Sequence, residues 1–108
     1  MKKDLPLISV ALATYNGEKF LREQLDSIFL QTYKNIEVIA CDDCSSDSTV
    51  IILEEYRDKF GLKLFKNEKN LGFVKNFEKA ISLCEGDYIA LSDQDDIWVV
   101  TKLEMLIN

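Results

Sequence analysis

The residues of this chain with the clearest chemical potential are acidic and lie close together. Three carboxylates fall within four positions, at Asp93, Asp95 and Asp96, directly after an apolar run. Carboxylates packed this closely repel one another unless a cation lies among them. Mg²⁺ or Mn²⁺ is the usual partner, because hard cations take oxygen ligands and leave coordination positions open for phosphate. The cluster therefore predicts a divalent-metal site, although a solvated loop or a helix N-terminus has a similar composition.

A second acidic pair, Asp42 and Asp43, also follows an apolar run, at residues 36–41. Taken alone, this pair is equally typical of a polar turn. Two acidic segments that each follow an apolar strand indicate a combined metal and nucleotide site, if the two strands end at the same edge of a sheet.

The composition excludes several classes of function. The 108 residues suffice for one domain, and the net charge of −6 makes a nucleic-acid partner improbable. No apolar run is long enough to span a membrane, and the start lacks the apolar stretch of a signal peptide. Three cysteines, an odd number, fit a reducing compartment better than a disulfide framework. We therefore expect a cytoplasmic protein.

Histidine is absent from the chain, and this restricts its chemistry. Cys41, Cys44 and Cys84 alone cannot complete a four-ligand zinc site. Any general base must be a carboxylate, a lysine or a tyrosine, or must lie outside this chain.

The order of apolar patterns predicts the fold. Strands are expected at 7–13, 36–41, 62–65 and 87–92, separated by amphipathic helices that begin near 17, 47, 73 and 101. Such alternation predicts an α/β fold, with a parallel sheet of about four strands and helices on both faces. Ligands of these folds bind beyond the carboxyl ends of the strands, where 14–16, 42–46 and 93–96 would gather.

Local signals add detail to the expected helices. Asn16 is a candidate N-cap for the first helix, and Glu18 has the spacing to pair with Arg22 on its exposed side. Gly61 and Gly86 are expected to end the second and third helices.

Some functional classes are disfavoured and others stay open. Neither a dinucleotide-binding glycine motif nor a P-loop is present. A phosphate-receiver signalling domain that binds Mg²⁺ is an alternative, since it is also α/β with acidic strand ends. A scaffold that has lost its ligand is a third possibility.

The motifs, taken in order, resemble the family 2 glycosyltransferases, which use nucleotide sugars and have the GT-A fold. The segments that carry the resemblance are 8–16, 18–21, 25–33, the Asp-Asp-x-Ser-x-Asp-x-Thr pattern of 42–49, Asn70-x-Gly72 with Asn76 and Ala80, Gly86-Asp-Tyr-Ile, and Asp93-Gln94-Asp95 followed by Asp96-Ile97-Trp98. The resemblance implies a Rossmann-like GT-A half over residues 1–108.

The resemblance also implies roles for single residues. Asp43 would accept a hydrogen bond from the N3–H of a pyrimidine base, while its neighbour Asp42 shapes the loop. Tyr15 would stack on or flank the base, and Ala13 and Thr14 would line the same pocket. The bland alternative for Tyr15 is packing on the edge of the sheet.

Other implied roles concern the diphosphate. Asp93 and Asp95 would hold Mn²⁺ or Mg²⁺, with Asp95 as the more direct ligand, and Gln94 and Asn76 would belong to the nucleotide site. Asn76 has the alternative of a solvated helix position. Trp98 is expected to pack as a core residue after the metal motif.

The implied protein is an inverting hexosyl- or rhamnosyltransferase that uses a UDP-sugar or dTDP-sugar and a glycan or lipid-linked acceptor in polysaccharide or lipopolysaccharide synthesis. Family members continue past the Asp-x-Asp motif, so we expect the chain to be a truncated donor-binding part, inactive alone, with its catalytic base downstream of residue 108. The full-length protein would be cytoplasmic or peripheral at the inner face of the membrane. An uncovered sheet edge predicts that the fragment self-associates.

Overall fold

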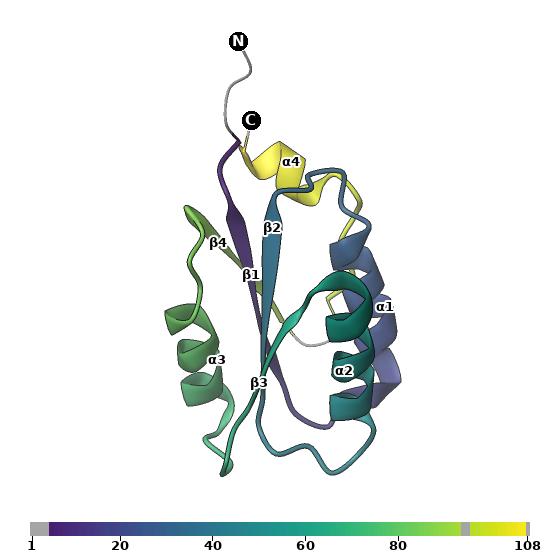
Figure 1. The fold of residues 1–108 in the computed structure, drawn as a ribbon, viewed down its shortest axis with the longest axis vertical. Helices are drawn as coiled ribbons and strands as arrows, with labels where there is room; N and C mark the ends of the chain where they lie inside the picture. Colours follow the sequence, from purple (N-terminus) through teal and green to yellow (C-terminus); the bar gives the residue numbers. More distant parts are fainter. Residues whose placement is uncertain (1–4, 94–95, 108) are drawn as a thin grey trace.

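The computed structural model describes residues 5–93 and 96–107, and a parallel sheet forms the centre of this part (Figure 1). Its strands are β1 (Ile8–Thr14), β2 (Ile36–Asp42), β3 (Lys63–Lys66) and β4 (Tyr88–Ser92). The helices are α1 (Glu18–Phe29), α2 (Thr49–Phe60), α3 (Phe73–Ser82) and α4 (Lys102–Ile107). The predicted α/β alternation is confirmed, and each expected strand lies within one residue of the observed bounds.

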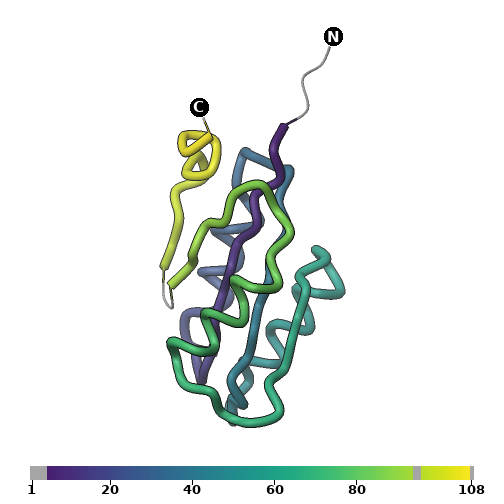
Figure 2. The backbone as a smooth tube through the Cα atoms, turned by 90° about the vertical axis from the view of Figure 1, so that its left-hand side faces the viewer, coloured from purple at the N-terminus to yellow at the C-terminus, as the bar shows by residue number. Residues whose placement is uncertain are grey.

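Helices cover both faces of the sheet, as the apolar strands require. Figure 1 shows α1 and α2 on one face and α3 on the other, and Figure 2 shows α3 running across β1. Alternate residues of β1 serve the two faces: Val10 and Leu12 pack in the core with α1 and α2, and Ala11 and Ala13 pack against α3. The small side chains on the second face let α3 approach the sheet closely.

The strand order is β3-β2-β1-β4, with every neighbouring pair parallel. The chain therefore starts at β1, moves outward to β3, and returns through α3 to the other side of β1. This order creates a switch point between β1 and β4, where doubly wound folds bind ligands. A receiver domain has β1 between β2 and β3. The observed neighbours of β1 are β2 and β4, which disfavours that alternative.

Two local predictions for α1 are wrong. Its N-cap is Gly17 and no side chain caps it, because Asn16 has a left-handed backbone (φ 49°) that an N-cap residue does not adopt. Arg22 pairs with Glu55 of α2 at 2.6 Å instead of with Glu18, because α2 packs beside α1 and offers a bidentate partner.

The two predicted helix-stop glycines have different outcomes. Gly61 ends α2 in the left-handed conformation (φ 80°), as expected. α3 ends at Ser82, so the prediction for Gly86 is wrong. A Cβ at Gly86 would lie 2.6 Å from Ser9 Oγ and 2.8 Å from the Leu7 carbonyl oxygen. This glycine is needed for close approach to β1.

Some large apolar side chains of the helices lie outside the core. Phe20, Phe60 and Phe73 are all substantially exposed, because they lie in terminal turns that reach beyond the sheet. Trp98 is 5% exposed and packs in the core, as predicted. Among the described residues, no helix has both the length and the apolar character needed to cross a membrane.

Candidate functional site

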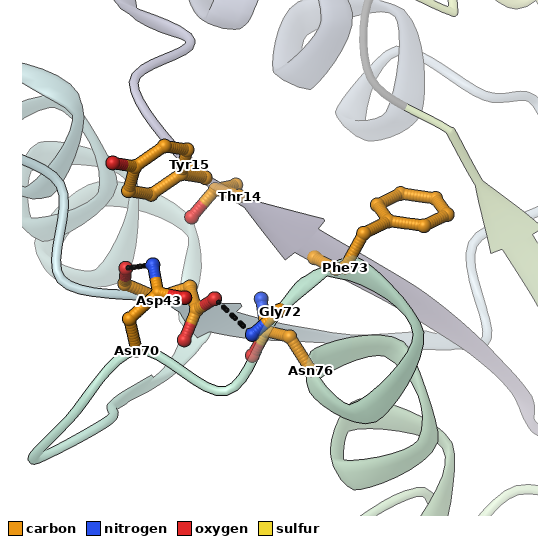
Figure 3. Close-up of a pocket in the computed structure, with 8 residues that line it drawn as sticks. Thr14, Tyr15, Asp43, Asn70, Gly72, Phe73 and Asn76 are labelled. Carbon is orange, nitrogen blue, oxygen red and sulfur yellow. Dashed lines mark hydrogen bonds between the residues drawn. The ribbon is translucent and has the colours of Figure 1, made fainter.

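A pocket of about 400 Å³ lies at the carboxyl end of the sheet, where β1, β2 and the start of α3 converge (Figure 3). It is lined by Ala13, Thr14, Tyr15, Asp43, Asn70, Gly72, Phe73 and Asn76. The structure thus brings together every described residue that the sequence assigned to a nucleotide. Gln94, which was assigned to the same site, lies outside the described residues.

Strand alternation explains why two adjacent aspartates have different surroundings. Cys41 packs on the α3 face of β2, so Asp43, two residues further on, turns toward α3 and the pocket. Asp42 turns to the opposite face, where its carboxylate accepts hydrogen bonds from the Thr14 hydroxyl (2.7 Å) and from Ser45. Asp42 therefore holds the loop, and Asp43 lines the pocket.

The Asp43 carboxylate is 2% exposed and held in a fixed position. Its Oδ1 accepts from the Leu71 N–H (2.7 Å) and the Asn67 amide (3.0 Å), and its Oδ2 accepts from the Gly72 N–H (2.9 Å). A carboxylate offers about four acceptor positions. Among the described residues, one position on Oδ2 is therefore left for a ligand.

The surroundings of Asp43 favour its ionised form. Burial by itself would raise the pKa of the carboxyl group. The Leu71 and Gly72 N–H groups, the Asn67 amide and the positive charge of Lys79 outweigh burial, and the pKa of Asp43 lies below its ordinary value. The pocket thus contains a buried, charged acceptor.

A network of buried amides supports this acceptor. Asn67 donates to Asp43 and to Asn76 Oδ1 (2.8 Å), and the Asn76 amide donates to the Cys41 carbonyl (2.9 Å). Asn76 is 2% exposed, so the alternative of a solvated helix position is wrong. Its position on the inner side of α3 places it against β2.

Sequence reasoning gave no role to Asn67, Asn70 or Gly72. Asn70 donates to the Asp43 carbonyl (3.2 Å), and Gly72 has a positive φ of 90° at the start of α3. A polar connection that ends in a glycine just before a helix was the available signal, since such a backbone directs N–H groups toward an anion.

Tyr15 forms the opposite wall of the pocket. Its side chain is about half exposed, and Figure 3 shows it across the pocket from Asp43. Half exposure is compatible with a ring that flanks a ligand and with the alternative in which Tyr15 packs on the sheet edge. Thr14 lies beside it, with its hydroxyl donated to Asp42. The arrangement offers a flat apolar surface opposite a charged acceptor.

Hydrogen bonds join the loops that follow β1 and β2. The Asn16 N–H donates to Ser45 Oγ (2.9 Å), and Asn16 Oδ1 accepts from the Ser46 N–H (2.8 Å). The Gly17 N–H donates to Thr49 Oγ1 (2.9 Å). The side-chain oxygen of Asn16 thus accepts a hydrogen bond from the neighbouring loop and stabilises the pocket rim.

The second acidic segment follows β4. Leu12 pairs with Ser92, so the chain leaves β4 near the level at which β1 ends at Thr14. Asp93 is exposed, and its N–H donates to Asp96 Oδ2 (3.3 Å). Asp95, the other predicted metal ligand, lies outside the described residues. Within the described ranges, no group of three or more metal-binding side chains occurs.

The family model described as glycosyl transferase family 2 matches residues 9–108. The Escherichia coli UDP-Glc:alpha-D-GlcNAc-diphosphoundecaprenol beta-1,3-glucosyltransferase WfgD is 38% identical over 102 residues, which are 94% of this chain and 40% of that protein. The chain thus spans less than half of this relative.

Solved structures agree with the sequence comparison. The crystal structure of S. aureus TarS 1–349 in complex with UDP has a TM-score of 0.85 at 36% identity, over 92% of this chain and 30% of that one. The mannosyltransferase PcManGT from Pyrobaculum calidifontis, in complex with GDP-Man and Mn²⁺, has a TM-score of 0.79 at 26% identity, over 86% of this chain and 28% of that one.

The doubly wound sheet, with its pocket beyond the carboxyl ends of the strands, defines an α/β half of GT-A type. The chain belongs to glycosyltransferase family 2.

Proposed function

We propose that this chain binds the nucleotide-sugar donor of a metal-dependent, inverting glycosyltransferase. The observation that carries the proposal is the buried Asp43 carboxylate, with one acceptor position left on Oδ2, opposite the half-exposed ring of Tyr15. A planar base with an N–H on its edge satisfies both groups: its face stacks on the aromatic ring and its N–H donates to the carboxylate.

The base chemistry favours uracil or thymine. Both have an N3–H that can donate to Asp43, whereas the N3 of cytosine is an acceptor and would be repelled by a carboxylate. TarS has been solved with UDP and with UDP-GlcNAc, which supports a UDP-sugar donor, and a dTDP-sugar presents the same base edge. Ala13 and Thr14 would line the base pocket, and Asn76 and Gln94 would complete the nucleotide site.

Asp93 and Asp95 would hold Mn²⁺ or Mg²⁺. The exposed carboxylate of Asp93, at the end of β4 beside β1, has the oxygen chemistry that these cations prefer. A bound divalent cation supplies charge neutralisation to the departing nucleoside diphosphate. PcManGT was solved with Mn²⁺, which supports this proposal.

The reaction would transfer a hexose or rhamnose to a glycan or a lipid-linked acceptor in polysaccharide or lipopolysaccharide synthesis. WfgD, whose acceptor is a diphosphoundecaprenol-linked sugar, supports a lipid-linked acceptor and a hexose donor. The acceptor oxygen would attack opposite the leaving group, and we assign no residue of this chain as its base. The three free cysteines support a cytoplasmic location, peripheral to the membrane that holds the acceptor.

Calorimetric titration tests the proposal. UDP and dTDP should bind the chain, CDP should bind at least tenfold more weakly, and Mn²⁺ should strengthen UDP binding. Asp95→Ala should remove the Mn²⁺-dependent part and leave the preference for UDP over CDP. Equal affinity for UDP and CDP would contradict the role of Asp43. A UDP affinity that is the same with and without Mn²⁺ would contradict the metal site.

A further inference from the structure

The inner face of α1 contains polar side chains among its apolar ones. Gln24 and Ser27 of α1, and Gln31 two residues after its end, are 2%, 8% and 0% exposed. Burying an amide or hydroxyl costs free energy unless it is hydrogen-bonded. All three are bonded to the segment that runs from the end of β4 into α4.

Gln24 is bonded to the start of that segment. Its amide donates to Ser92 Oγ (2.9 Å) and to the carbonyl oxygen of Asp93 (2.6 Å). The other bonds of Asp93 in the described structure are local, to Asp96 three residues later. Gln24 therefore provides the described hydrogen bond that ties Asp93 to a rigid helix.

We propose that Gln24 is a positioning residue for the site that binds the donor diphosphate. Gln24 acts by fixing the backbone of Asp93. The inference rests on the proposed function, because it concerns the residue assigned there to the metal. Ser92, the last residue of β4, pairs in register with Leu12 of β1. Asp93 therefore follows the sheet near the end of β1, where Ala13 and Thr14 line the pocket.

The hydrogen-bond partners of Gln24 differ from those of Ser27 and Gln31. Ser27 accepts from the Trp98 N–H (3.0 Å). Gln31 donates to the Val99 carbonyl (2.7 Å) and accepts from the Leu103 N–H (3.0 Å), both well beyond the metal motif. Gln31, two residues after the end of α1, has the same side chain and a similar burial as Gln24. It is therefore a matched control.

The experiment compares Gln24→Met with Gln31→Met in the 108-residue chain. Each substitution keeps the length of the side chain and removes its amide. Three measurements are made on each variant: the Tm, the affinity for uridine without metal, and the affinity for UDP with and without Mn²⁺.

Both variants should have a lowered Tm and unchanged uridine affinity, because neither Gln24 nor Gln31 lines the base pocket. Only Gln24→Met should weaken Mn²⁺-dependent UDP binding, by about tenfold or more, the usual effect of losing a group that orients a metal ligand. Gln31→Met should stay within about twofold of the unaltered chain.

The outcomes separate the two proposals. Mn²⁺-dependent UDP binding that Gln24→Met and Gln31→Met weaken equally would overturn the positioning role and leave the proposed function intact. Absence of Mn²⁺-dependent binding in the unaltered chain would overturn the metal part of the proposed function and the inference with it. If Gln24→Met does not fold, Gln24→Glu replaces it, since a glutamate can accept from Ser92 but cannot donate to Asp93; the same tenfold loss is expected.

Discussion

The ends of β2 and β4 are both acidic, but the two carboxylates differ in burial and in hydrogen bonding. Asp43, after β2, is enclosed by two backbone N–H groups and an asparagine amide, and its side chain is almost fully buried. Asp93, after β4, is exposed, and its described hydrogen bonds are made by its backbone.

The difference shows how one composition supports two kinds of chemistry. The charge of Asp43 is compensated by groups of the protein itself. This carboxylate is therefore preorganised to accept a hydrogen bond from an uncharged N–H group. The charge of Asp93 has no comparable set of donors among the described residues and is suited to an added cation. The Asp43 side chain therefore contributes to the folded structure. The described hydrogen bonds of Asp93 come from its backbone and leave its side chain out of the fold.

The largest expected effect follows from removing the enclosed carboxylate. Asp43→Ala should lower the free energy of unfolding by about 3 kcal/mol or more, because hydrogen bonds to a charged group contribute about 1.5–3 kcal/mol each and the buried N–H groups lose their acceptor. Urea denaturation followed by circular dichroism measures the change. A loss under 1 kcal/mol would show that the enclosure adds little to stability.

The same carboxylate predicts an acid-dependent loss of stability. The pKa of Asp43 is lower in the folded protein than its ordinary value of 3.8. Its contribution is therefore complete above about pH 3.8 and is lost as the pH falls through the folded-state pKa. The difference in unfolding free energy between the unaltered chain and Asp43→Asn should be constant from pH 7 to pH 5 and shrink below pH 4. A difference that stays constant down to pH 3 would contradict this.

Sequence patterns predicted where β2 ends, but they did not predict the hydrogen-bond partners of Asp43. The apolar run of 36–41 was sufficient to locate the strand and the aspartates that follow it. The partners of Asp43 come from residues 67–72, and their approach depends on the backbone of Gly72 and on how α3 packs over β1. Such tertiary geometry has no periodic signal. The Asn16 prediction was wrong for the same reason, since the competing partner, Ser46, lies in another loop.

The two strands also differ in how well they are covered, which predicts self-association. β2 is flanked by β1 and β3, whereas the described partner of β4 is β1 alone. Ile89 and Leu91 of β4 are 43% and 51% exposed on the face that α3 leaves uncovered. We expect concentration-dependent dimers in light scattering, and Leu91→Glu should shift them to monomers with little change in Tm. A chain that is monomeric at all concentrations would contradict this expectation.

The smallest expected effect on stability belongs to the exposed carboxylate. Asp93→Asn keeps the backbone bonds to Gln24 and Asp96, so its free energy of unfolding should stay within about 0.5 kcal/mol of the unaltered chain. Its Mn²⁺-dependent affinity for UDP should nevertheless fall at least tenfold, because the charge that attracts the cation is gone. Asp58→Asn, a change at an exposed site on α2 whose described ion pair is with the adjacent Arg57, is the control and should alter neither quantity. If Asp93→Asn destabilised the chain as strongly as Asp43→Ala, the carboxylate after β4 would be structural like the one after β2. A selective loss of metal-dependent binding would instead establish that folding places this residue by its backbone and leaves its side chain for the ligand.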